Sequence, residues 1–252
     1  IPSEILDIYQ KFKTAKFEVY LVGGCVRNLF LQKKVKDWDI TTSATPEQIL
    51  KLFPDGFYDN KFGTVGVPIQ ISNEKRIVEI TTFRTEHGYS DRRRPDVVKW
   101  GKTIEEDLSR RDFTVNAIAL QLRTYNLKLT TNIIDPFNGQ EDIENKIIRS
   151  VGDPKQRFKE DALRLLRAIR IATEHGFTIE NKTWKEIVQD SKLIAEVSGE
   201  RVRIEVLRIL ASKHPYDGTI LLKNSSLLQY ILPELLEGIG VSQVRPGRHH
   251  LS

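Results

Sequence analysis

The 252-residue sequence contains no methionine and only one cysteine, Cys25. A single cysteine excludes a disulfide within the chain and fits a reducing compartment, so we expect a cytoplasmic protein. No apolar run approaches the ~20 residues that cross a bilayer, and no membrane partner is therefore expected. Hydrophobic residues make up 39% of the chain and charged residues 29%, which is typical of a globular protein with one large or two small domains.

Positive charge is in modest excess and is clustered along the chain. Lysine and arginine number 39 against 34 aspartates and glutamates. Basic residues stand together at 33–34, 92–94 and 110–111, and arginines recur at 164, 167 and 170 along one expected helix. Most charge runs are only solvated surface, but clusters of this kind favour a polyanion such as RNA.

Two aspartates separated by one residue, Asp37 and Asp39, follow a Gly23-Gly24 turn by thirteen residues. On a β-strand such residues face the same side, roughly 6.6 Å apart. Two carboxylates aimed into one site repel each other unless a divalent cation lies between them. Hard oxygen ligands suit Mg²⁺ or Mn²⁺, so we predict that Asp37 and Asp39 are catalytic metal ligands.

The residues before this pair predict a phosphate site. Residues 17–22 read as a strand, Gly23 and Gly24 allow a sharp turn, and residues 25–31 open a helix. A helix N-terminus with free N–H groups and a nearby Arg27 attracts anions. Each feature alone is common, because Gly-Gly turns and surface Asp-x-Asp pairs occur widely. Their alignment within one strand–helix–strand unit points to chemistry on a nucleoside triphosphate.

Local sequence patterns predict the other helices and strands. In the first helix, the helical spacing of four apolar residues predicts an inward face made of Ile5, Ile8, Tyr9 and Phe12. Capping residues at Thr45 and Thr103 start further helices. The predicted helices cover 1–16, a run from 45, 103–121, 159–175 ending at Gly176, 183–189, 199–211 and 219–228, and the predicted strands cover 62–71 and 76–83. Beyond residue 154 we expect helices alone.

Four blocks of sequence, in order, resemble the head of class II tRNA nucleotidyltransferases and bacterial poly(A) polymerases. They are residues 21–28, 36–42, 110–117 and 157–164, and with their surroundings they span residues 21–170, about three fifths of the chain. One departure is Asn28, where the family usually has aspartate. Asparagine keeps the size and hydrogen-bonding ability of aspartate but lacks the charge needed for an ion pair.

The resemblance implies an α+β fold, in which a polymerase-β-like nucleotidyltransferase head (a small mixed sheet with helices) precedes an all-helical neck and a partial body. We place the head at 1–145, the neck with a nucleotide-selecting helix at 146–205, and the start of a body at 206–252. Family members are usually longer, so we expect the body to be truncated. The implied reaction is template-independent addition of A, or of C and A, to the tRNA 3′ end, with Mg²⁺ or Mn²⁺ as cofactor and ATP, and CTP where C is added, as substrates.

Nucleotide contacts also follow from the resemblance. It implies that Asp112 and Asn116 meet the ribose and that Arg111 meets the phosphates, beside Gly23, Gly24 and Arg27. A carboxylate that accepts the 2′-hydroxyl would favour ribonucleotides. The alternative for 110–113 is a surface Arg–Asp pair within a helix.

Asp161 and Arg164, extended by Arg167, are implied to select the base. An arginine fork and an aspartate acceptor together imitate the pairing edges of C and A. The alternative is an i, i+3 salt bridge on a helix surface. Glu79 shares a strand face with Ile77 and Thr81, and the residues leave open whether it is a third catalytic carboxylate or a strand-edge charge.

Some choices stay open on sequence alone. Residues 87–94 match the flexible loop of family members that add A, which argues against addition of C alone. Poly(A) polymerase is the alternative enzyme, and a non-catalytic RNA-binding module is the alternative of another class. The tryptophans at 38, 100 and 184 are expected in packing rather than in base stacking. Neither a metal pair nor a tag remnant is expected at His249-His250.

Overall fold

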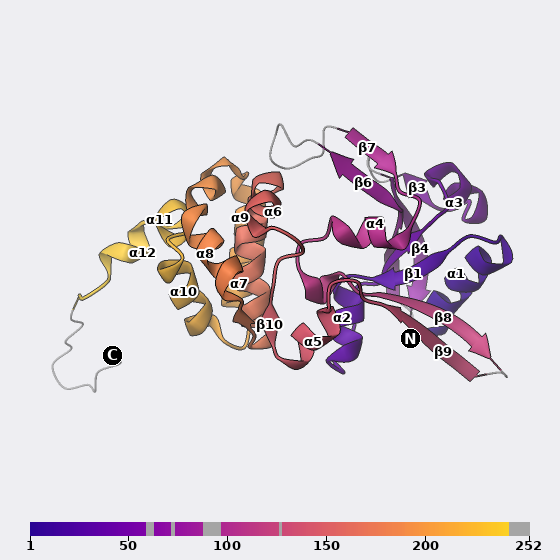
Figure 1. Cartoon of the computed structure of the whole chain (residues 1–252), viewed down its shortest axis with the longest axis horizontal. Coiled ribbons are helices and arrows are strands. Elements are labelled where there is room, and N and C mark those ends of the chain that lie inside the picture. The colour runs from indigo at the N-terminus through magenta and orange to yellow at the C-terminus, as the bar shows by residue number, and fades with distance from the viewer. Residues whose placement is uncertain (59–62, 72–73, 88–96, 126–127, 242–252) are drawn as a thin grey trace.

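The computed structural model describes residues 1–58, 63–71, 74–87, 97–125 and 128–241. Figure 1 shows a half built around a sheet, which carries the N-terminus, followed by a half built of packed helices. His249 and His250, and most of the expected loop at 87–94, lie outside the described residues. Among the described residues, no helix is long and apolar enough to cross a membrane.

A seven-stranded mixed sheet forms the first half, in the order β3-β4-β5-β2-β1-β8-β9. β2 and β5 are parallel, and the other neighbours are antiparallel. The strands are β1 (Val19–Val22), β2 (Asp39–Thr42), β3 (Phe57–Tyr58), β4 (Thr64–Ile71), β5 (Glu74–Thr82), β8 (Ala119–Tyr125) and β9 (Lys128–Ile134). This confirms the predicted small mixed sheet and the predicted strands at 62–71 and 76–83. A separate antiparallel pair joins β6 (Arg84–His87) to β7 (Val97–Trp100).

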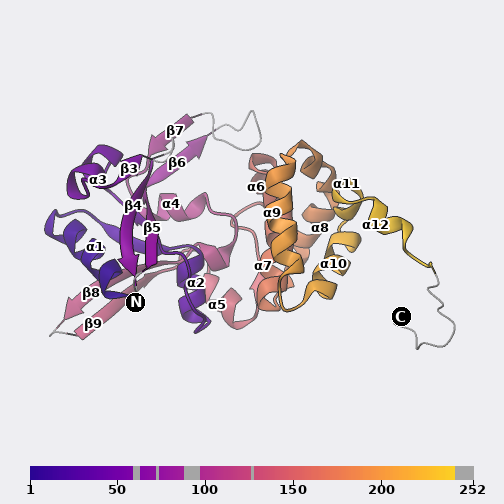
Figure 2. The ribbon, with the colours of Figure 1, turned by 180° about the vertical axis from the view of Figure 1, so that it is seen from behind.

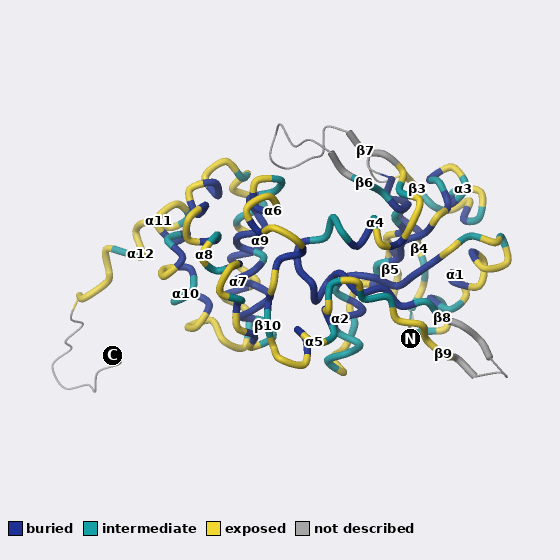
Figure 3. The backbone as a smooth tube through the Cα atoms, in the orientation of Figure 1, coloured by how far each residue is buried: buried dark blue, intermediate teal, exposed yellow. Residues whose placement is uncertain are grey.

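Side chains along a strand point alternately to the two faces of the sheet. In the centre of this sheet both faces are buried, each in its own apolar cluster. Leu21 of β1 and Ile40 of β2 belong to the large apolar cluster, which also contains residues of α1 (Ser3–Thr14) and α3 (Pro46–Leu52). Tyr20 and Val22 belong to a second cluster with residues of α4 (Ile104–Ser109). Figure 3 shows β1 as buried, and all four of its residues are buried. The predicted inward face of the first helix is confirmed.

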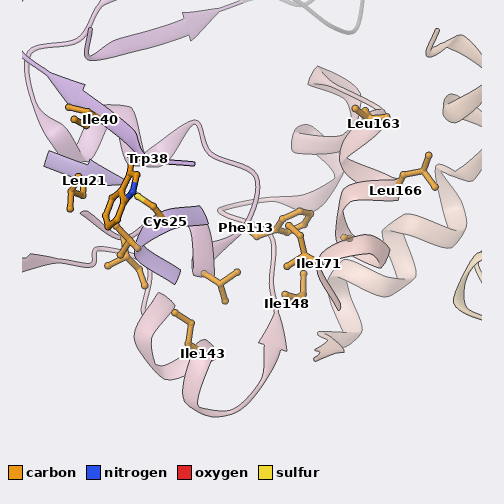
Figure 4. Packing of buried hydrophobic residues seen from close by; sticks show 14 of the residues in the cluster. Leu21, Cys25, Trp38, Ile40, Phe113, Ile143, Ile148, Leu163, Leu166 and Ile171 are labelled. Carbon is orange, nitrogen blue, oxygen red and sulfur yellow. The ribbon is translucent and has the colours of Figure 1, made fainter. Parts of the chain in front are cut away.

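The second half is helical apart from one short parallel pair, β10 (Ile147–Ile148) and β11 (Thr178–Ile179), which the sequence did not predict. Its helices are α5 (Gly139–Glu144), α6 (Pro154–Glu160), α7 (Leu163–His175), α8 (Asn181–Gln189), α9 (Gly199–Leu210), α10 (Pro215–Asn224), α11 (Leu228–Ile231) and α12 (Glu234–Glu237), with a 3-10 turn at Ser191–Glu196. The large apolar cluster continues from the sheet into this half, as Figure 4 shows for Leu21, Phe113 and Leu166.

Helix boundaries follow local chemistry where side chains cap them. The Thr45 and Thr103 hydroxyls accept hydrogen bonds from the backbone of Gln48 and Glu106, whose side chains bond back, so both predicted caps are confirmed. Gly176 ends α7 with φ of 66°, a left-handed conformation that favours glycine.

Two predicted helices are wrong in extent. The helix expected at 103–121 ends at Ser109, and a 3-10 turn at Thr114–Asn116 and strand β8 follow. The chain leaves the helix because residues 112–114 pair with 149–151: the Thr114 N–H donates to the Arg149 carbonyl and the Val151 N–H to the Asp112 carbonyl. Tertiary pairing here outweighs the helical pattern.

The helix expected at 159–175 is interrupted at 161–162, between α6 and α7. The Asp161 side chain accepts a hydrogen bond from the Leu163 N–H, which caps the start of α7 locally. The helix expected at 219–228 instead runs over 215–224, with Pro215 at its first position. The domain boundaries proposed between residues 145 and 146 and between residues 205 and 206 stay predictions.

Candidate functional site

A glycine turn meets Asp39 at the end of β1. Val22, the last residue of β1, pairs with Asp39, the first residue of β2, and Gly23 starts α2 (Gly24–Phe30) with φ of 73°. A Cβ built on Gly23 would lie 3.0 Å from Asp39 Oδ2 and 3.2 Å from Arg111 Nη1. The turn, a carboxylate and a guanidinium therefore converge, and only glycine fits both the backbone and the space.

Three carboxylates gather at this end of the sheet. Asp39 lies opposite Glu79 on the parallel neighbour β5, so their side chains emerge on one face of strands about 4.8 Å apart. Burial raises the pKa of Asp39 to about 6, Arg111 opposes the rise, and the charges of Glu79 and Asp37 add to it. Asp37 is exposed and lies in a bend before β2, so the prediction that both aspartates lie on the strand is wrong for Asp37. Its charge nevertheless acts on Asp39.

The donor set at this cluster fits Mg²⁺ or Mn²⁺. Within the described ranges no group of three or more His, Cys, Asp or Glu side chains is arranged to hold a metal ion. Asp37 and Asp39 are hard oxygen donors, however, and Mg²⁺ commonly takes one or two carboxylates and completes its shell with water and substrate phosphates. The accumulated negative charge at Asp39 is the electrostatic condition that a cation relieves.

Arg111 is held towards this point by a buried carboxylate that sequence reasoning missed. Asp107 on α4 is fully buried and accepts hydrogen bonds from Arg110 Nη2 at 2.7 Å and Arg111 Nη2 at 3.0 Å. Burial would raise the pKa of Asp107, but the two arginines outweigh it and lower that pKa to about 2. The i, i+3 and i, i+4 spacing from 107 to 110 and 111 is the signal that was available in the sequence.

A hydrogen-bonded chain joins four of the predicted nucleotide-binding residues. Arg27 Nη1 donates to Asn116 Oδ1 at 2.6 Å, and Asn116 Nδ2 donates to Asp112 Oδ1 at 3.0 Å. Arg167 Nε and Nη2 donate to Asp112 Oδ2 at 2.8 and 2.5 Å. Burial would raise the pKa of Asp112, but the charge of Arg167 and the hydrogen bonds from Asn116 and Arg167 hold it well below its usual range. The chain links α2 of the sheet half to α7 of the helical half.

Two donors near the turn are buried without a hydrogen-bond partner among the described residues: the Nε atoms of Arg27 and Arg111. Burial lowers the pKa of Arg27 to about 10, and the neighbouring Arg170 adds to this effect. Asn28 accepts a hydrogen bond from Arg27 Nη2 at 3.2 Å, so at this position a neutral amide takes the place of an ion pair. The two unpartnered Nε donors suit a phosphate.

The side chains of Asp161 and Arg164 form ion pairs with other residues and not with each other, so the i, i+3 salt-bridge alternative is wrong. Asp161 accepts hydrogen bonds from Arg201 of α9, from Nη2 at 2.8 Å and from Nη1 at 3.3 Å. Arg164 Nη1 donates to Glu160 Oε2 at 2.7 Å and to the Arg157 carbonyl at 3.1 Å. Arg201 was missed because forty residues separate it from Asp161, and no local spacing indicates the contact.

The tryptophans differ in their surroundings. Trp38 is buried in the large apolar cluster, and Trp184 is partly buried against it, as expected for packing. Trp100 is 44% exposed, and its ring covers Gly63, where a Cβ would lie 2.4 Å from the ring.

Parts of both halves of the chain match known protein-family models. Residues 19–149 match the family model described as the poly A polymerase head domain. Residues 176–238 match a model described as the probable RNA and SrmB-binding site of polymerase A.

Among curated proteins, the chain is 42% identical over 230 residues to a CCA-adding enzyme of Geobacillus kaustophilus (strain HTA426), covering 91% of this chain and 54% of that protein. It is 45% identical over 210 residues to a CCA-adding enzyme of Lactobacillus helveticus (strain DPC 4571), covering 83% and 50%. The chain thus spans about half the length of the curated relatives it matches.

Solved structures agree with this placement. The chain resembles the crystal structure of the Bacillus stearothermophilus CCA-adding enzyme in complex with CTP, with a TM-score of 0.78, 39% identity, and coverage of 91% of this chain and 53% of that one. It also resembles the Thermotoga maritima CCA-adding enzyme complexed with tRNA, with a TM-score of 0.73, 27% identity, and coverage of 91% and 53%.

Proposed function

The chain belongs to the family of class II tRNA nucleotidyltransferases and bacterial poly(A) polymerases, and from this premise we propose that it adds C and A to the 3′ end of tRNA without a nucleic-acid template. The observation that carries the proposal is the convergence of the Gly23 turn, Asp39 and Arg111. We further propose a cytoplasmic location, which fits the single cysteine and a tRNA substrate.

In the proposed reaction, the 3′-hydroxyl of the RNA attacks the α-phosphorus of CTP or ATP. A phosphodiester bond forms, the bond from that phosphorus to the oxygen bridging the α- and β-phosphates breaks, and pyrophosphate leaves. The α2 N-terminus and Arg111 bind the phosphates, and the orphan Nε atoms of Arg27 and Arg111 add donors. Asp37 and Asp39 would hold Mg²⁺, which when bound activates the hydroxyl and stabilises the developing charge. Glu79 lies opposite Asp39, which supports its role as a third catalytic carboxylate.

Ribose and base would be read on the helical side of the site. Asp112 and Asn116 supply an acceptor and an amide for the ribose, and Arg167 fixes the Asp112 carboxylate. Asp161 and Arg164 supply the acceptor and the donors for the base, and an ion pair orients each of them, to Arg201 for Asp161 and to Glu160 for Arg164. Pre-oriented groups lose less entropy on binding, which favours selection between C and A.

The test uses a tRNA ending before CCA, incubated with CTP alone, ATP alone, or both. We expect two C additions with CTP, completion to CCA with both, and no transfer when Mg²⁺ is chelated. Asp37→Ala and Asp39→Ala should each abolish transfer while the far-ultraviolet circular dichroism spectrum stays unchanged. An oligo(A) primer serves as the comparison.

Continued A addition to oligo(A), with no use of CTP, would identify the chain as a poly(A) polymerase instead. RNA binding without any transfer by the unmodified chain would identify it as a non-catalytic RNA-binding module.

A further inference from the structure

The residues at the end of α4 contact both halves of the molecule. Figure 2 shows α4 on the sheet half and α7 on the helical half. Arg111 reaches the glycine turn, since its Nη1 would lie 3.2 Å from a Cβ built on Gly23. The carbonyl of the preceding residue, Arg110, accepts a hydrogen bond at 3.3 Å from Nη2 of Arg164 on α7. A single peptide unit therefore joins the arginine proposed for the phosphates to the arginine proposed for the base.

Asp107 fixes this pair of arginines from within α4. Its side chain is fully buried. Oδ1 accepts hydrogen bonds from Arg110 Nε at 3.1 Å and Nη2 at 2.7 Å, and Oδ2 accepts one from Arg111 Nη2 at 3.0 Å. Each oxygen holds one arginine, so the carboxylate cannot turn without breaking a buried ion pair. Nη1 of Arg111, and its Nε, which has no partner among the described residues, stay available for a phosphate.

Arg164 is held equally closely on the side of α7. It is 9% exposed, and its Nη1 donates to Glu160 Oε2 at 2.7 Å and to the Arg157 carbonyl at 3.1 Å. Together with the bond to the Arg110 carbonyl, these contacts occupy three of the five N–H groups of the guanidinium. The remaining donors can meet a base. Because the guanidinium is rigid, a base that displaces these donors also pulls on the Arg110 carbonyl.

Asp107, Arg110 and Arg111 thus form a unit, which we call the α4 frame, at a fixed spacing from Arg164. A nucleotide whose base fits Arg164 has its phosphates set against Arg111 by this spacing. Misplacement of reacting groups by about 1 Å can reduce rates on the order of 100-fold, so the spacing matters for transfer as well as for binding.

The chemistry of the bases gives this spacing a role in selection. At position 4, cytosine carries an amino group that can donate to the Asp161 carboxylate, whereas uracil carries a carbonyl oxygen that cannot. CTP can therefore satisfy Asp161, Arg164 and Arg111 together. UTP must give up either the contacts to its base or the alignment of its phosphates.

We propose that Asp107 is a positioning residue for nucleotide selection. It holds Arg111 and the Arg110 carbonyl in one frame with Arg164, so that the base that fits also brings its phosphates into register. The inference rests on the proposed nucleotidyl transfer and deepens it, because it links the choice of base to the placement of the triphosphate. Asp107 acts through its two arginines and not by contact with the nucleotide.

The test uses Asp107→Asn, which keeps the size of the side chain and removes its charge. Glu205→Gln is the matched control, because Glu205 is also a buried acid and pairs with the buried Arg170, at positions with no proposed contact to the nucleotide. Dissociation constants for CTP and UTP are measured by isothermal titration calorimetry with Mg²⁺ and without RNA. Values of kcat/KM for both nucleotides are measured on tRNA ending before CCA.

We expect the preference for CTP over UTP to fall about tenfold in Asp107→Asn, in binding and in kcat/KM, because CTP loses a charge-assisted hydrogen bond that UTP does not make in register. Glu205→Gln should keep the preference even where thermal stability falls. If Asp107→Asn fails to fold, Asp107→Glu keeps the buried charge, displaces both arginines by one methylene group, and should reduce the preference in the same way.

A double-mutant cycle tests the link to Arg164. Arg164→Lys removes the fork that joins the base to the Arg110 carbonyl. Since both residues belong to one arrangement, Asp107→Asn should reduce the preference little further in the Arg164→Lys background. Independent roles would instead give additive losses, which would overturn the link.

Equal losses of affinity for CTP and UTP in Asp107→Asn would also overturn the proposal, because Asp107 would then only stabilise the fold. Equal binding of CTP and UTP by the unmodified chain would do the same. The calorimetric measurement needs no catalysis, so it tests the α4 frame even if the unmodified chain fails to transfer nucleotides, a result that would refute only the proposed function.

Discussion

Gly23 leaves no room for a side chain against Asp39, since a Cβ at position 23 would lie 3.0 Å from the Asp39 Oδ2 atom. Gly23→Ala must displace either the carboxylate or the turn that begins α2. Misplacement of reacting groups by about 1 Å can reduce rates on the order of 100-fold, and we expect a loss of this size in kcat/KM for CTP addition. Steady-state kinetics on tRNA ending before CCA would measure it.

Gly176→Ala is the matched control for this substitution. Gly176 has a similar φ of 66°, but a Cβ there would meet nothing within 4 Å. Gly23→Ala should lose more thermal stability from backbone strain, because Gly23 has ψ of −143°, in a region that essentially only glycine adopts, whereas Gly176 is left-handed. Only Gly23→Ala should lose activity. Equal activity losses would show that strain, and not contact with Asp39, is responsible.

Arg167 supports the buried Asp112 carboxylate, and we expect its removal to destabilise the fold. Arg167→Ala leaves a buried charge without its ion-pair partner, which costs about 3 kcal/mol in the free energy of unfolding. Urea denaturation followed by tryptophan fluorescence would measure the loss. Arg208→Ala removes an exposed ion pair to Glu174 and should cost less than about 1 kcal/mol. Similar losses in the two variants would contradict the burial argument.

The sequence predicted those parts of the site that lie close together along the chain. The strand before Gly23, the helix after it and the strand that starts at Asp39 form one local unit, whose hydrophobic pattern, turn residues and motif all agree. The caps at Thr45 and Thr103 were equally local, because each uses a side chain three residues from its partner.

The rest depended on contacts between distant segments. Residues 112–114 leave the predicted helix because they pair with 149–151, and no periodicity reveals that pairing. The partner of Asp161 likewise comes from α9 and not from Arg164. Which acid holds which arginine is decided by the packing of α7 on its neighbours, and this is why motif residues were found but their partners were not.

Arg201 fixes the carboxylate of Asp161, so we expect it to affect the choice of base. In Arg201→Ala the carboxylate can rotate, and a rotated acceptor no longer distinguishes the edges of C and A as well. We expect the ratio of kcat/KM for CTP to that for ATP to change about tenfold, which corresponds to about 1.4 kcal/mol. Single-nucleotide incorporation on tRNAs ending before and after CC would give this ratio.

Arg203→Ala is the comparison for Arg201→Ala, because Arg203 is an exposed arginine on the same helix. It should leave the ratio unchanged. Equal shifts from the two arginines would point to a general effect of α9 charge on RNA binding, not to orientation of Asp161.

His175 joins the two halves of the molecule through a contact that depends on its neutral form. Its Nδ1 lies 2.9 Å from Lys33 Nζ, so the neutral ring accepts a hydrogen bond from the lysine. Burial lowers the pKa of His175 to about 3, and the charges of Arg27 and Lys33 add to this. Between the unfolded value of about 6.5 and the folded value, only the unfolded chain gains this proton, so stability is present above pH 6.5 and falls as the pH decreases towards 3.

His175→Gln keeps an acceptor for Lys33 but cannot titrate. We therefore expect the wild-type chain to lose more stability than the variant between pH 7.5 and pH 5. The difference should be at most about 1 kcal/mol, because the ring is partly exposed and solvent screens its charge. Urea midpoints of both proteins at the two pH values isolate the histidine, since the acidic side chains titrate alike in each. Parallel pH profiles would show that His175 takes up its proton in the folded state, and the neutral contact with Lys33 would then not control stability.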